Sequence, residues 1–147
     1  MRAPGPPARR RHLMSRLQTG LRGEATMMVT PERTAEAVGS GQVGVFATPQ
    51  LIALLEIAAV DALRDHLESG ETSVGTHLEV SHLAATPVGM KVRAEAVLER
   101  AEGRTLTFSV AAWDEREKIG EGRHVRMVVS RERFLARVEG KKVFQSR

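Results

Sequence analysis

The stretch 47-ATPQLIALLEIAAVDAL-63 decides the fold of this 147-residue chain. It opens with Thr48-Pro49, which is typical of a helix start, because threonine can cap free amides and proline tolerates the first helical position. Apolar side chains then cover nearly every side of three turns, and a helix that is apolar all round is enclosed by protein. The sequence therefore predicts one buried helix from Thr48 to about Leu67, ending at Ser69-Gly70.

Glu56 is the one acid in the middle of this apolar run. An ionised carboxylate in an apolar environment must be paired, protonated or facing a cleft, because burying it alone is costly. Two interpretations stay open for Glu56. It either emerges at an exposed stripe or subunit contact, or it has a polar partner on a neighbouring strand and acts as a general base or nucleophile.

Thr48 is open to two interpretations as well. A threonine before a helical proline is commonly a plain N-cap. The N-terminus of a helix also presents free amides that suit a developing oxyanion. Pro49 has no N–H, so those donors would come from Gln50, Leu51 or another segment.

The segments around the helix predict a single antiparallel sheet. Residues 23–29 form a first short strand, and the Gly-containing stretch 32–47 shows no period and is predicted to be a loop. After the helix the apolar period changes to two, with short turns that make neighbouring strands antiparallel. The four later strands are predicted at 74–82, 90–98, 106–112 and 118–130. We expect an α+β hotdog fold, in which an antiparallel sheet of about five strands wraps around one long central helix.

The histidines of the predicted strands are candidates for chemistry. His77 and His82 are five residues apart, so they face opposite sides of the sheet and cannot form a local metal pair. His82 is the better candidate because small residues beside it leave space for a ligand. His124 and Arg126 share one face of the last strand, which on pattern alone is a solvated face, whereas Val125, Met127 and Val129 share the other.

Composition excludes several classes of site. The absence of cysteine excludes disulfides, thiolate metal sites and a cysteine nucleophile. No apolar run approaches the roughly 20 residues that span a bilayer, so we expect a cytoplasmic protein without a membrane partner. No stock phosphate, metal or dinucleotide motif is present, so we expect no metal and no cofactor.

Positive charge is concentrated at the N-terminal end of the chain. Residues 1–22 hold six arginines and no acid, whereas the other 125 residues hold 16 basic and 18 acidic groups. Nucleic acid is therefore not expected as the main partner. The arginine-rich start is compatible with a plain disordered extension, a transit peptide or a nucleic-acid-binding arm. We predict a disordered basic extension over 1–20, one domain over 21–138, and a flexible tail over 139–147.

Three segments carry a resemblance to a known family. The helix start 47-ATPQLIALLE-56, the segment 80-VSHLAATPVG-89 and the strand 120-GEGRHVR-126 are similar to those of the fluoroacetyl-CoA thioesterase-like hotdog proteins, over about residues 24–138. The resemblance implies hydrolysis of an acyl-CoA thioester at a subunit interface of a homodimer, or of a higher oligomer, with coenzyme A entering only as part of the substrate. It also implies catalytic roles for Thr48, Glu56 and His82, whose spacings of 8 and 26 residues match the family.

The resemblance further implies substrate-binding roles for Phe46, Gly75 and Arg126. The sequence departs from the fluoroacetyl-specific pattern at 38-VGSGQVGVFA-47, where Phe46 is the only aromatic residue of the lid region. We therefore carry over the reaction class and not the fluorinated substrate. The alternative hypothesis is a non-catalytic hotdog protein that binds an acyl-CoA or a related small ligand.

Overall fold

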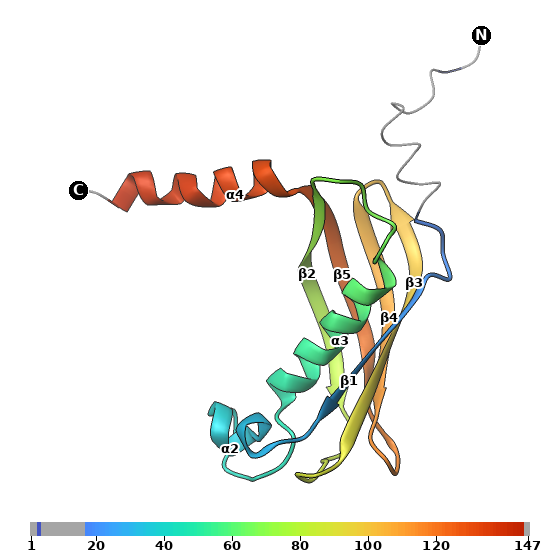
Figure 1. The fold of residues 1–147 in the computed structure, drawn as a ribbon, viewed down its shortest axis with the longest axis vertical. Helices are drawn as coiled ribbons and strands as arrows, with labels where there is room; N and C mark the ends of the chain where they lie inside the picture. The colour runs from blue at the N-terminus through green and yellow to red at the C-terminus, as the bar shows by residue number, and fades with distance from the viewer. Residues whose placement is uncertain (1–2, 4–16, 146–147) are drawn as a thin grey trace.

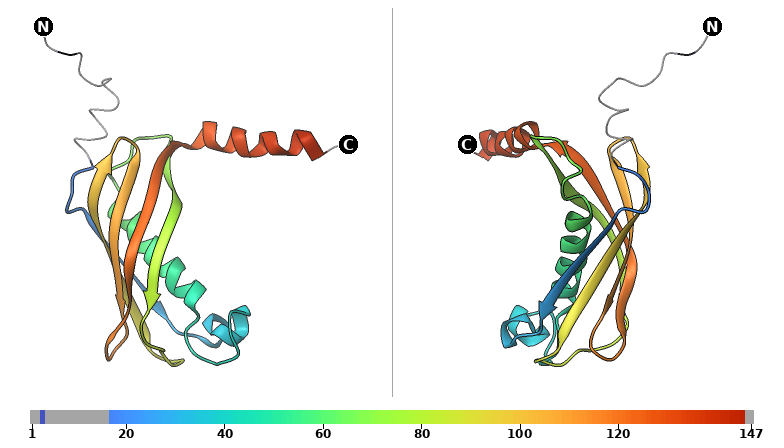
Figure 2. Two further views of the ribbon diagram at one scale, coloured as in Figure 1. Left: turned by 180° about the vertical axis from the view of Figure 1, so that it is seen from behind. Right: turned by 45° about the vertical axis from the view of Figure 1, so that its right-hand side comes forward.

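One curled sheet of five antiparallel strands packs against one helix (Figures 1 and 2). The computed structural model describes residues 3 and 17–145. The strand order is β1-β3-β4-β5-β2. The strands are β1 (Arg22–Met28), β2 (Glu71–His82), β3 (Lys91–Glu102), β4 (Thr105–Trp113) and β5 (Lys118–Ser130), and the helix is α3 (Thr48–Ala62). The predicted α+β architecture and all five predicted strands are confirmed.

The helix α3 packs closely on β1 at Gly23. A Cβ atom on Gly23 would lie 2.1 Å from the Ala58 carbonyl oxygen and 2.3 Å from the Ala62 nitrogen. Glycine is therefore required at this position for the helix backbone to approach the strand. The backbone N–H of Glu24 also donates to the Asp61 carboxylate of α3, at 2.9 Å. These contacts cover the free edge of β1 with the helix.

The helix differs from its prediction at both ends. Its N-cap is Ala47, and the Thr48 side chain makes no capping hydrogen bond. It ends at Ala62 instead of Leu67, and the chain then turns through Asp65, whose φ of 67° lies in the left-handed region. The prediction overran because Arg64, Asp65 and Glu68 continue a helix-compatible composition after the apolar face has ended.

One stripe of α3 is not covered by the sheet. Ile57 is 49% exposed and Val60 is 50% exposed, whereas Leu51, Leu54 and Leu55 are buried. The expectation of an all-round enclosed helix is therefore wrong within one chain. Five strands cover only part of a helical cylinder, so the remaining stripe faces outward.

The segments flanking the main fold contain more structure than predicted. The stretch predicted as a loop forms η1 (Pro31–Arg33) and α2 (Ala35–Val38), the latter capped by the Thr34 side chain. After β5 the chain forms α4 (Arg131–Gly140) and η2 (Lys141–Gln145), where a tail was predicted from 139. Figure 1 shows α4 projecting away from the sheet, at the end opposite to α2.

The described residues of the predicted extension include one that packs in the core. Leu17, assigned to the extension, is 1% exposed and belongs to the hydrophobic core. Most of the predicted extension 1–20 falls outside the described residues. Within the described part of the chain, no helix is long and apolar enough to cross a membrane.

The inward face of β5 is the opposite of the one that its valines suggested. His124 is fully buried and Arg126 is 6% exposed, whereas Met127 is 40% exposed. Gly120 shares the inward face, since a Cβ there would lie 2.9 Å from a side-chain carbon of Leu51 on α3. The interpretation of His124 and Arg126 as a solvated face is therefore wrong, and this burial brings both residues to Glu56.

Candidate active site

Thr48 and His82 form a hydrogen-bonded pair at the N-terminal end of α3. The Thr48 hydroxyl lies 2.7 Å from His82 Nδ1. His82 is the last residue of β2 and pairs with Gly120 of β5, so the register directs its side chain to the face that carries α3. His77 pairs with Val125 on the opposite face and is exposed, as predicted from the five-residue spacing.

His82 is held in a partly desolvated position. Burial lowers its pKa below the ordinary value of 6.5, and a backbone interaction with Ala84 partly offsets this effect. The ring is therefore neutral near pH 7 and can accept a proton. Its Nε2 atom is buried and has no hydrogen-bond partner among the described residues.

The amides at the helix N-terminus are already used within the helix. The N–H groups of Gln50 and Leu51 both donate to the Ala47 carbonyl, at 3.0 Å each. The hypothesis that these two amides bind an oxyanion is therefore not supported. The Thr48 side chain contacts His82 instead of capping the helix.

Glu56 lies in a second polar cluster, on the strand side of α3. Its Oε2 atom is 3.3 Å from Nη1 of Arg126 and 3.8 Å from Nε2 of His124. Glu56 is 36% exposed, whereas both partners are buried. The carboxylate is therefore paired on one side and open on the other. Glu56 has a polar partner on a neighbouring strand and also lies partly exposed, and its role as base or nucleophile stays a prediction.

Arg126 is fixed by a dense set of contacts. Its Nε donates to the Ser73 hydroxyl at 2.8 Å, its Nη2 donates to the Ser73 carbonyl at 3.0 Å, and its Nη1 donates to His124 Nε2 at 3.0 Å. Burial lowers the pKa of Arg126, and Glu56 acts in the opposite direction. A guanidinium held at this many points has little freedom, so it keeps Glu56 in place.

The hydrogen bonds define the tautomer of His124. Its Nδ1 lies 2.9 Å from the His77 carbonyl, which can only accept, so Nδ1 carries the proton. Its Nε2 accepts from Arg126. Burial lowers the pKa of His124, with Arg126 adding to this effect, so the ring stays neutral.

Gly75 makes the space in which this cluster forms. It pairs with Arg126 in the β2–β5 ladder. A Cβ atom at Gly75 would lie 2.5 Å from Glu56 Oε2 and 3.1 Å from Cε1 of His124. The strand backbone therefore approaches the carboxylate closely only because residue 75 has no side chain.

The three residues with expected catalytic roles form two separate groups in one chain. Thr48 and His82 contact each other, but Glu56 follows Thr48 by eight residues on the same straight helix. At a rise of 1.5 Å per residue this separates them by about 12 Å along the axis. Glu56 therefore joins Arg126, His124 and Gly75, not the Thr48–His82 pair.

Phe46 does not line an open site. Its side chain is 1% exposed and belongs to the hydrophobic core. The backbone N–H of Phe46 donates to the Thr86 carbonyl at 2.8 Å. The substrate-binding role implied for Phe46 stays a prediction, and within one chain its ring packs in the core.

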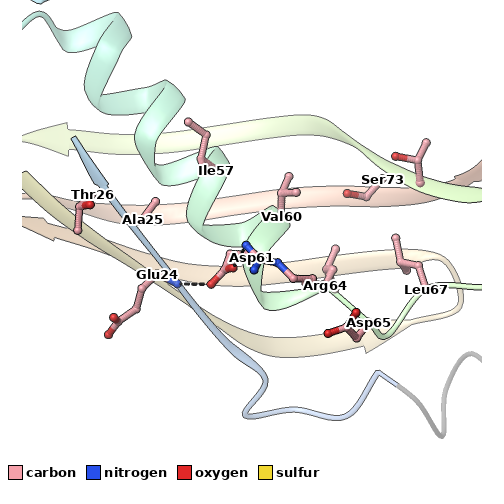
Figure 3. Close-up of a pocket in the computed structure, with 12 residues that line it drawn as sticks. Glu24, Ala25, Thr26, Ile57, Val60, Asp61, Arg64, Asp65, Leu67 and Ser73 are labelled. Carbon is pink, nitrogen blue, oxygen red and sulfur yellow. Dashed lines mark hydrogen bonds and ion pairs between the residues drawn. The ribbon is translucent and has the colours of Figure 1, made fainter. Parts of the chain in front are cut away.

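A pocket of about 540 Å³ adjoins the Glu56 cluster and contains none of the three expected catalytic residues. It is lined by β1, the second half of α3 and the start of β2, and Figure 3 shows Ile57, Val60 and Ser73 along the space between α3 and β2. Ser73 belongs both to this pocket and to the contacts of Arg126. The open side of the Glu56 cluster therefore continues into an apolar surface.

Sequence reasoning missed the supporting roles of Ser73 and His124. The signal for His124 was present in the period of two through Gly120, Gly122, His124 and Arg126. Two small residues followed by two polar ones on one strand face are compatible with close packing of a helix that carries an acid. The signal for Ser73 was absent, because a serine before a strand is unremarkable.

A family model and a sequence relative both match this chain to fluoroacetyl-CoA thioesterases. The family model described as "Fluoroacetyl-CoA-specific thioesterase" matches residues 29–132. A fluoroacetyl-CoA thioesterase from Streptantibioticus cattleyicolor is 45% identical over 97 residues, which cover 66% of this chain and 70% of that protein.

Solved structures agree with these matches. A fluoroacetyl-CoA thioesterase structure superposes with a TM-score of 0.80 at 37% identity, covering 85% of this chain and 97% of the other. A thioesterase superfamily member from Thermus thermophilus gives a TM-score of 0.81 at 29% identity, covering 88% and 97%. A hot-dog-like protein from Thermanaerovibrio acidaminovorans, at 24% identity, shares the fold with a TM-score of 0.79. The chain therefore belongs to the fluoroacetyl-CoA-specific thioesterase family and is a thioesterase with the hotdog fold.

Proposed function

We propose that the protein hydrolyses acyl-CoA thioesters at a composite site built from two copies of the chain. The observation that carries this proposal is the pairing of a threonine hydroxyl with a neutral histidine at one end of α3, and of a glutamate with a buried arginine further along it. Each group supplies part of what thioester cleavage needs, and neither is complete alone.

The chemistry assigns a role to each group. Nδ1 of His82 accepts the proton of the attacking oxygen, which is the Thr48 hydroxyl or a water held by it. Glu56, whose carboxylate contacts Arg126 on one side and is open on the other, serves as base or as transient acyl acceptor. The attacking oxygen bonds to the carbonyl carbon, the carbon–sulfur bond breaks, and the leaving coenzyme A thiolate takes up a proton from His82 or from solvent. Where Thr48 or Glu56 is the attacking group, a water molecule then cleaves the acyl-enzyme bond, which releases the free acid and restores the side chain.

The free edge of the sheet supports a second copy of the chain as partner. Of the two edge strands, β1 is covered by α3 through Gly23 and Asp61. The strand β2 is not covered, and its residues Gly75, Thr76, His77, Glu79 and Ser81 are exposed. An uncovered edge strand is a ready surface for pairing with another chain. The exposed stripe of Ile57 and Val60 faces the same side and gives apolar area to an interface.

The register of such a pairing is the one that brings Glu56 of one chain to the Thr48–His82 pair of the other. An antiparallel pair of β2 strands related by a two-fold axis at Glu79 places the bulge at Gly75 and Thr76 opposite His82 of the partner subunit. Glu56 contacts Gly75. The partner's Thr48–His82 pair would then meet Glu56, and two equivalent sites would form per dimer.

The acyl group is expected to differ from that of a fluoroacetyl-specific enzyme. The segment before α3 forms η1 and α2 with exposed Val38 and Val43, and its one aromatic residue, Phe46, is buried. A pocket without an aromatic cover discriminates acyl chains by shape, at about 1–3 kcal/mol per methylene. We propose short unsubstituted acyl-CoA esters as substrates.

The test is thiol release from a panel of acyl-CoA esters of increasing chain length. Wild type is compared with Glu56→Ala, with His82→Ala, and with Glu99→Ala, a control at an exposed position of β3 that lies outside the proposed interface. We expect turnover of at least one ester, loss of turnover in the first two variants, and wild-type rates in the control. Saturable binding of CoA esters without any thiol release would instead identify a binding protein, and full activity of both folded site variants would refute the assigned site.

A further inference from the structure

The segment 83-LAATPVG-89 follows His82 and contains the buried residue Thr86, whose side chain does not reach the Thr48–His82 pair. Thr86 is fully buried. Its hydroxyl donates to Oδ2 of Asp114, at 2.8 Å, in the turn between β4 and β5. Its carbonyl accepts the backbone N–H of Phe46, at 2.8 Å, two residues before Thr48. Thr86 thus connects the segment 45–47, which leads into α3, with the turn between β4 and β5.

Asp114 organises the turn to which Thr86 is attached. Its second oxygen, Oδ1, accepts the backbone N–H groups of Arg116 at 2.8 Å and Glu117 at 2.9 Å. The N–H of Asp114 also donates to the Glu117 carbonyl at 2.9 Å. The carboxylate is therefore fully used in holding this turn and Thr86 together, and the turn leads directly into β5.

The same strand β5 holds the His82 side of the pair. His82 pairs with Gly120, and the N–H of the next residue, Leu83, donates to the Ile119 carbonyl at 2.7 Å. Both partners of the catalytic hydrogen bond therefore depend on one hairpin. His82 is attached through the β2–β5 ladder, and Thr48 is attached through Phe46, Thr86 and Asp114.

We propose that Thr86 and Asp114 are positioning residues that set the contact between Thr48 and His82. Thr48 depends on the contact between Thr86 and the segment 45–47, because Thr48 is exposed and its side chain has no helix-capping hydrogen bond to fix it. The segment before Thr48 is also held by the Val45–Pro87 bridge, again in the Thr86 segment. Its other contacts are with residues 33–35: a Thr34–Phe46 bridge, the N–H of Ala35 donating to the Val45 carbonyl, and the N–H of Ala47 donating to the Arg33 carbonyl. A displacement of about 1 Å between reacting groups lowers a rate by about 100-fold. The proposal rests on the proposed function of Thr48 and His82.

The test compares Thr86→Val, which removes the hydroxyl and keeps the shape, with Thr86→Ser, which keeps the hydroxyl. Asp114→Asn weakens the same contact from the other side. The control is Leu98→Ala, a core truncation on β3 that lowers stability at the end of the strand away from the Asp114 turn, where Leu98 pairs with Phe108. Each variant is measured for the free energy of unfolding, for kcat and KM with the best ester of the panel, and for the His82 ring nitrogen shifts by NMR.

We expect Thr86→Val and Asp114→Asn to lower kcat by about 10- to 100-fold with KM nearly unchanged, and to shift the His82 Nδ1 resonance. Thr86→Ser and Leu98→Ala should retain kcat and the resonance. Wild-type kcat and His82 shifts in folded Thr86→Val would overturn the proposal, as would a loss of kcat in Leu98→Ala as large as that in Thr86→Val. The NMR shift does not depend on turnover, so it separates this outcome from a failure of the assigned thioesterase site.

Discussion

Mixing two inactive variants is the sharpest test of a site shared between chains. Glu56 and the Thr48–His82 pair are about 12 Å apart along α3 in one chain, and the proposed register brings Glu56 to the partner's His82. Glu56→Ala and His82→Ala are each expected to abolish turnover as homodimers. In a heterodimer of the two, one site lacks both groups, and the other site has Glu56 from one chain and His82 from its partner intact.

The recovered activity follows from counting sites. Random exchange at equal concentrations gives half heterodimers, each with one intact site of two, so about one quarter of the wild-type activity per chain should return. The variants are mixed, exchanged by reversible dilution or mild denaturant, and assayed for thiol release. A mixture of Glu56→Ala with Thr48→Ala should behave in the same way.

The control mixture is His82→Ala with Thr48→Ala. Both changes remove the same hydrogen-bonded pair, so every site of this heterodimer is damaged and no activity should return. Absence of recovery in the first mixture, with exchange confirmed by a tagged chain, would refute a site shared between chains. Recovery in the control mixture would refute the assignment of Thr48 and His82 to one functional unit.

Three further predictions follow from contacts within the chain. Gly75→Ala should lower kcat/KM by about 10- to 100-fold with little change in Tm, because its Cβ would displace the Glu56 carboxylate; a wild-type rate would contradict this. Gly23→Ala should lower the free energy of unfolding by about 3 kcal/mol, since its Cβ would meet the backbone of α3; urea melts measure it. His124 has a folded-state pKa below its unfolded value of 6.5, so the unfolded state binds the proton first. Stability should be constant above about pH 6.5 and fall below it by up to about 1.4 kcal/mol per pH unit. His124→Gln should flatten this fall in urea melts, and an unchanged slope would contradict the assignment.

The periodicity of the sequence determined the elements and their order. A helix apolar on most sides and four strands with a period of two predict one helix packed on one antiparallel sheet, because this arrangement buries both patterns in one core. The resemblance to the thioesterase family implied catalytic roles for Thr48, Glu56 and His82, and the structure shows that two of these touch each other.

Tertiary structure alone decided how these residues are grouped. A period of two shows which side chains of β5 share a face, but it does not show which face turns inward, and here the inward face carries His124 and Arg126 instead of Val125, Met127 and Val129. A spacing of eight residues likewise does not show that Glu56 is remote from its expected partners. These outcomes depend on how the strand ladder and the close approach of α3 to Gly23 set the two layers against each other. Such contacts join residues far apart in the sequence, so local patterns contain no record of them.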